Sequence, residues 1–132
     1  MSFFDDYEWK TILELLSGAT SAGKLQWEKG PKTDEGEFTT NLVGESSYVI
    51  KSRDGDGEFP YVLMVLNSKG TLLDSFEAVP YDPDHFEYQE EVNSKSLEEL
   101  YTGIRRQISG AAAAFDSITT SLSALQPDPK PF

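Results

Sequence analysis

The sequence predicts an α+β fold with an N-terminal helix, an antiparallel meander of four or five strands and a long C-terminal helix. Two amphipathic helical patterns flank a series of short alternating segments within 132 residues. Both helices are expected on one sheet face, because each apolar face needs another element to cover it. The length allows one domain, predicted over residues 1–125, followed by a Pro-rich flexible tail at residues 126–132.

The first helix is predicted from its start signals. Asp5 is a suitable N-cap residue, and Glu8 follows three positions later, as in a capping box. Phe4 and Trp9 then occupy the two positions of a hydrophobic staple. Apolar residues recur at helical spacing as far as Leu16, which gives the helix one apolar face. The candidate C-terminal stops are Gly18 and Gly23.

The middle of the chain alternates between strand-like segments and short turns. The predicted strands are residues 24–28, 37–42, 47–51, 59–67 and 71–78. The gaps between them are too short for parallel crossovers, so neighbouring strands should be antiparallel. Residues 59–67 are apolar on both faces, which is typical of a central strand.

The acidic segment 54–58 invites comparison with a calcium loop, but its spacing is that of a turn. A calcium loop starting at Asp54 requires glycine at its sixth position and glutamate at its twelfth. Phe59 and Val65 stand there instead. The two Asp-Gly pairs fit a hairpin turn, where glycine accepts a positive φ. No metal or cofactor is predicted.

The last element carries an unbroken heptad pattern. Ser96 and Glu99 form a candidate capping box at its start. Apolar residues then alternate at spacings of four and three: Leu97, Tyr101, Ile104, Ile108, Ala111, Phe115, Ile118, Leu122 and Leu125. The favoured interpretation packs residues 110–114 closely on the sheet or on the first helix. The alternative is a kink near Ser109 and Gly110, with the distal half docking on another chain.

Charge and composition limit the possible partners. The net charge is −12 and the pI is near 4.3, which disfavours nucleic acid and anionic membranes as partners. The first interpretation of this charge is solubility, and the alternative is attraction of a basic protein surface. The absence of cysteine removes disulfides and thiol catalysis. No signal peptide is visible, and the expected location is the cytoplasm.

The predicted binding residues lie in two places. The long connection at residues 79–95 mixes acidic and aromatic side chains, which suit recognition of a basic partner. Its candidates are Tyr81, Asp82, Asp84, Phe86, Glu87 and Tyr88. Arg105 and Arg106 flank the heptad seam, where they are expected either to pair with the acidic body or to contact an acidic partner.

The leading function is a non-catalytic, acidic protein-binding module. One concrete form is an immunity or anti-defence inhibitor of a basic enzyme, with DNA mimicry as the extreme case. An enzyme is not expected, because His85 is the single histidine and neither a nucleophile elbow nor a P-loop occurs. A small-molecule sensor, or a hydrolase using a carboxylate pair, is the alternative of another class. A homodimer through residues 97–125 is a further possibility.

One stretch of the chain carries a family resemblance. Residues 15–27 have the form Leu-Leu…Thr-x-x-Gly-Lys-Leu-x-Trp. With residues 61–66, 70–78 and 97–106, this stretch resembles a group of small uncharacterised bacterial and phage-type domains over most of residues 9–108. The resemblance implies a helix, a β-meander and a closing helix, and it implies no activity. Size, acidity and class also resemble type III secretion chaperones, although those interleave a helix between strands.

Overall fold

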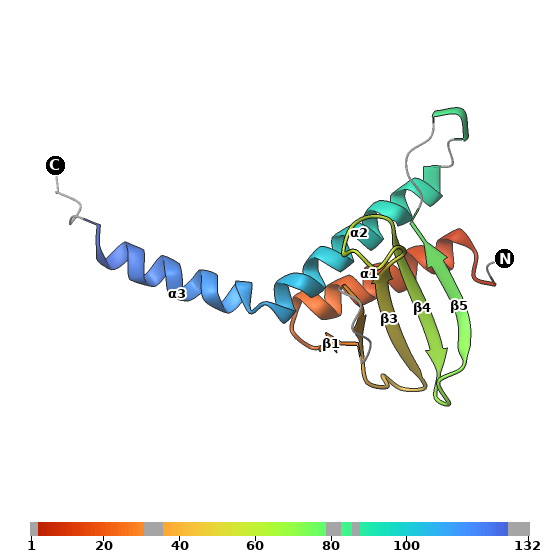
Figure 1. Cartoon of the computed structure of the whole chain (residues 1–132), viewed down its shortest axis with the longest axis horizontal. Helices are drawn as coiled ribbons and strands as arrows, with labels where there is room; N and C mark the ends of the chain where they lie inside the picture. Colours follow the sequence, from red (N-terminus) through yellow and green to blue (C-terminus); the bar gives the residue numbers. More distant parts are fainter. Residues whose placement is uncertain (1–2, 31–35, 79–82, 86–87, 127–132) are drawn as a thin grey trace.

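A computed structural model describes residues 3–30, 36–78, 83–85 and 88–126 of the chain. These residues form a five-stranded antiparallel sheet, three α-helices and one short 3-10 helix (Figure 1). The helices are α1 (Asp6–Ser21), η1 (Pro83–His85), α2 (Tyr88–Ile108) and α3 (Ala111–Ala124). The strands are β1 (Glu28–Lys29), β2 (Phe38–Thr39), β3 (Ser46–Ser52), β4 (Tyr61–Asn67) and β5 (Leu72–Glu77).

The start of α1 confirms the predicted capping box and staple. The Glu8 amide donates to Asp5 Oδ1 at 2.8 Å, and the Asp5 amide donates back to Glu8 Oε1 at 3.0 Å. The rings of Phe4 and Trp9 meet edge to face at 5.2 Å between centroids. The helix ends at Ser21, and its stop is Gly23 rather than Gly18, because Gly23 adopts a φ of 73° and its amide donates to the carbonyl of Thr20.

The sheet is a meander in which each strand pairs with the next along the chain. Its register places Phe38, Ile50, Leu63 and Phe76 opposite one another across four strands. All four are buried, so this row forms the centre of the covered face. The intervening side chains of β4 are half-buried on the other face. The predicted meander and α+β class are confirmed.

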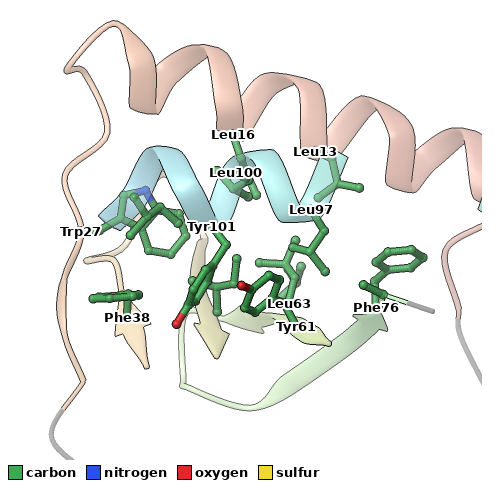
Figure 2. Packing of buried hydrophobic residues seen from close by; sticks show 14 of the residues in the cluster. Leu13, Leu16, Trp27, Phe38, Tyr61, Leu63, Phe76, Leu97, Leu100 and Tyr101 are labelled. Atoms are coloured by element: carbon green, nitrogen blue, oxygen red, sulfur yellow. The ribbon is translucent and has the colours of Figure 1, made fainter. Parts of the chain in front are cut away.

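Helices α1 and α2 lie on the same side of the sheet, as predicted. In Figure 2, α2 lies between α1 and the strands, with Leu100 directed toward Leu16 of α1. On its other side, the Tyr101 ring stacks on Tyr61 of β4 at 3.9 Å. The rings of Trp9 in α1 and Phe76 in β5 are 5.5 Å apart, so α1 also reaches the sheet. The core is therefore continuous through all three layers.

Two amide side chains of α2 hold the helix pair in register. Asn93 is fully buried and donates through Nδ2 to the carbonyl of Asp6 at 2.9 Å. Near the other end of α2, Gln107 Oε1 accepts the Trp27 amide at 2.9 Å and Gln107 Nε2 donates to the Leu25 carbonyl at 2.8 Å. The starts of the two helices therefore lie together, and so do their ends. Because Gln107 takes the Trp27 amide, β1 is shorter than the predicted strand at residues 24–28.

The C-terminal helix differs from the prediction at its start. The predicted cap at Ser96 is wrong, because α2 begins eight residues earlier at Tyr88 and Ser96 lies within it. The segment 88–95 is therefore helix rather than part of a long connection. Asn93 and Ser94, two polar residues in this first part, are buried against the rest of the fold. Polar residues that pack inward obscure the helical apolar pattern in the sequence.

The single long helix is two helices, which confirms the alternative of a kink. Gly110 has φ of 70° and ψ of 18°, a left-handed conformation that ends α2 and precedes α3. No residue of α3 is buried, so the predicted packing of residues 110–114 on the sheet or on α1 is wrong. The covered face is already filled by the buried part of α2, as far as Ile104. Figure 1 shows α3 extending away from the domain.

None of the helices in the described part of the chain combines the length and apolarity needed to cross a bilayer. The predicted tail, from residue 127 onward, lies outside the described residues.

We expect Gln107→Ala to lower the free energy of unfolding by about 2 kcal/mol, because the Trp27 amide and the Leu25 carbonyl lose their partner. The matched control is Gln26→Ala, which removes an exposed bond to the Gly23 carbonyl and should change stability by less than about 0.5 kcal/mol. Urea unfolding of both variants measures the difference. Equal losses in the two variants would show that Gln107 does not hold the helix ends together.

Candidate functional site

The predicted binding segment at residues 79–95 is only partly described. Tyr81, Asp82, Phe86 and Glu87 lie outside the described residues. Asp84 lies exposed in η1. Tyr88 is the first residue of α2, and 70% of it is exposed. The described residues therefore place one acidic and one aromatic candidate at the surface near the start of α2, and the predicted cluster stays a prediction.

The two predicted arginines lie near the end of α2, and both are exposed. Arg105 places its guanidinium carbon 6.0 Å from the centroid of the Tyr101 ring, which allows a cation–π contact. Among the described residues, ion pairs are formed by Lys10 and Arg53, and neither Arg105 nor Arg106 joins one. Within the described part of the chain, Arg105 therefore contacts an aromatic ring and no carboxylate.

An aromatic group lies beneath Arg105. Tyr61 and Tyr101 are stacked at 3.9 Å with 20° between their planes, and the Phe38 ring is 5.7 Å from that of Tyr101. The Tyr101 hydroxyl donates to the Gly36 carbonyl at 3.0 Å, which fixes the ring. A side chain at Gly36, where φ is 84°, would collide with this hydroxyl and with the backbone of Gly57.

The rings of Phe38 and Tyr101 border a cleft of about 430 Å³ at the end of α2. Its lining includes two acidic side chains, Asp56 and Glu58, and two basic ones, Lys29 and Arg105. Sequence reasoning assigned residues 54–58 to a turn only, because their meeting with α2 depends on the tertiary packing. The mixed charges and the aromatic wall suit a small polar group. The described residues contain no group of three or more acidic or histidine side chains that could hold a metal ion.

Burial raises the pKa of Tyr61 and of Tyr101 above the ordinary value of a phenol, because the phenolate loses solvation. The negative charge of Glu58 raises the pKa of Tyr61 further. For Tyr101, the neighbouring Tyr61 adds to the rise and Arg105 opposes it. The stacked pair therefore stays neutral to higher pH than an exposed tyrosine does.

An apolar surface that the described residues leave uncovered lies on α3. Phe115, Ile118 and Leu122 are each 54% exposed and Leu125 is 78% exposed. Their spacings of three, four and three place them on one side of the helix, and together they are called the α3 stripe. The sequence predicted this set as half of a seam, but the exposure of that half comes from the break at Gly110.

Comparisons with protein-family models, with curated proteins and with solved structures find no match to this chain. The resemblance to small bacterial and phage-type domains and the likeness to secretion chaperones therefore stay predictions.

We expect the stability of the fold to fall as pH rises above about 10, the ordinary pKa of tyrosine. The raised pKa values of Tyr61 and Tyr101 favour the folded state fully below that pH, and this contribution is lost as pH rises through the folded-state values. Tyr61→Phe keeps a stacked ring and removes one phenol, so its unfolding free energy should fall less steeply with pH. Tyr88→Phe, at an exposed position, is the control. Urea unfolding across this pH range measures the slopes, and identical slopes for Tyr61→Phe and wild type would contradict the expectation.

Proposed function

We propose that the protein is a non-catalytic protein-binding module and that α3 is its docking element. The observation that carries the proposal is the α3 stripe, four large apolar side chains on a helix in which no residue is buried. A contiguous apolar surface of this kind on a protein marks an interaction site.

The stability of α3 supports this proposal. The helix has 14 residues, and isolated helices of that length are marginal in water. Its N-cap residue, Gly110, offers no side-chain hydrogen bond to the first turn. The first four residues are alanines, which favour a helix but do not supply tertiary packing. A protein surface that covers the α3 stripe would supply the packing that the helix lacks on its own domain.

The mode of binding follows from the spacing. Anchors at positions i, i+3, i+7 and i+10 are those of an amphipathic helix that lies in an apolar groove. The only charged residue of α3 is Asp116, which lies on the side away from the stripe. Apolar contact rather than charge would therefore provide the affinity of the α3 stripe.

The acidic body is a separate surface with a separate role. The net charge of −12 would attract a basic protein and orient its approach. An inhibitor of a basic enzyme is the concrete form of that role. The α3 stripe and the acidic body can act together, because one is nearly free of charge and the other carries it.

Site-directed photocrosslinking tests the docking role of α3. A benzophenone side chain in place of Ile118 should form covalent protein adducts in the cells that make the protein, because position 118 lies on the stripe. The same group in place of Thr120, on the opposite side of α3, is the matched control and should form at least about tenfold fewer adducts. Equal labelling from both positions, or no adduct from position 118, would contradict the proposal.

A further inference from the structure

An apolar groove lies beside the C-terminal half of α1, between this helix and the residues at the start of β3. It has a volume of about 460 Å³, with its floor formed by the buried side chains of Leu16 and Leu25. Ile12 and Leu15 of α1 line it together with Val43 and Tyr48 from the region of β3. Leu15 is 68% exposed and Val43 is 50% exposed. The groove is therefore a second apolar surface, apart from the α3 stripe.

The groove and the α3 stripe are both nearly free of charge on a strongly acidic chain. Lys24 is the single charged residue among the described residues that line the groove. The residues of α3 that flank the stripe are small and neutral: Ala114, Thr119 and Ser121. Two copies of this chain could meet through these two surfaces without bringing acidic side chains together. Contact between the acidic surfaces of two chains, each of charge −12, would instead place acid against acid.

We propose that the occupant of the groove is the α3 stripe of a second copy of the chain, and that the exchange is reciprocal in a twofold dimer. This inference rests on the proposed docking role of α3 and names its partner. Each chain then contributes one helix and one groove, which is the arrangement that an isologous interface requires. The two helix–groove contacts form together, so the dimer buries twice the apolar area of a single helix in a single groove.

The path of the chain supports a second copy rather than the chain's own groove. Hydrogen bonds from Gln107 to the carbonyl of Leu25 and from the Trp27 amide to Gln107 hold the ends of α1 and α2 together. From that shared end, the short connection through Ser109 and Gly110 directs α3 outward (Figure 1). The described residues of the same chain do not cover the groove at the C-terminal half of α1. A second copy related by a twofold axis can place its groove along this α3, and its own α3 then lies in the groove of the first copy.

The dimer leaves the acidic body exposed on both copies. A basic partner predicted from the net charge would therefore meet twice the charge of one chain. Repulsion between the two bodies should weaken the dimer at low ionic strength, so its dissociation constant should fall a few-fold between about 0.05 M and 0.5 M salt. A complex held by acid–base attraction has the opposite dependence on salt.

Sedimentation equilibrium of the purified full-length chain tests the inference with two pairs of variants. Ile118→Asp with Leu122→Asp alters the stripe, and Thr120→Asp with Ser123→Asp adds the same charge to the outer side of α3. Leu15→Asp with Val43→Asp alters the groove, and Phe3→Asp with Leu72→Asp alters two exposed apolar residues elsewhere. The stripe pair and the groove pair should each raise the dissociation constant of the dimer by at least about 100-fold. The two control pairs should change it by less than about threefold.

A mixture of the two defective proteins provides the decisive measurement. The stripe variant keeps an intact groove, and the groove variant keeps an intact α3. Mixed together, they should form a one-to-one complex, although neither dimerises alone. In this complex the α3 of the groove variant occupies the groove of the stripe variant. The complex also shows that both variants are folded.

Three outcomes would overturn the inference. The first is a wild-type chain that stays monomeric at all accessible concentrations. The second is a dimer that the stripe variant abolishes and the groove variant leaves unchanged, which indicates pairing of α3 with α3. The third is an adduct at position 118 with a different protein and never with this chain. That third result leaves the proposed docking role of α3 intact, whereas no adduct at position 118 removes both.

Discussion

The burial of α2 between α1 and the sheet is the contact on which the rest of the structure depends. Leu100 is directed toward α1 and Tyr101 stacks on Tyr61 of β4, so one helix supplies both faces of the core (Figure 2). The amides of Asn93 and Gln107 then set the register of α1 against α2 at both ends. The buried polar atoms in this region are paired, which avoids the cost of leaving a donor or acceptor without a partner.

The position of α2 also decides which apolar residues are left over. A strand of seven residues is about 23 Å long, whereas 21 helical residues extend about 31 Å. The sheet is therefore covered before the heptad pattern ends, and the last fully buried position is Ile104. The left-handed Gly110 turns the remaining heptads away from the sheet. The same packing places the end of α2 beside residues 54–58, which creates the charged aromatic cleft. It also leaves the groove between α1 and the start of β3.

Local signals in the sequence predicted much of this fold. The capping box at Asp5 and the staple of Phe4 on Trp9 depend on neighbours in the chain, and both are present. Each of the five predicted strand segments overlaps an observed strand, but β1 and β2 are only two residues long. The predictions are wrong where a contact between residues far apart in the sequence overrides the local signal. Ser96 has the form of an N-cap, but burial of Asn93 against the carbonyl of Asp6 extends the helix back to Tyr88. Trp27 alternates like a strand residue, but Gln107 takes its amide.

The sequence by itself determined the first helix, the antiparallel order of the strands, the net negative charge and the existence of a heptad seam. A seam of this kind shows that an apolar stripe needs a cover. The sequence pattern of the seam is the same whether the cover is the chain's own sheet or another molecule. Only the tertiary structure decided where the first cover ends, because that depends on the length of the sheet and on the crossing of α1 and α2. The division at Gly110, with α2 inside the domain and α3 outside it, is the physical result of that limit.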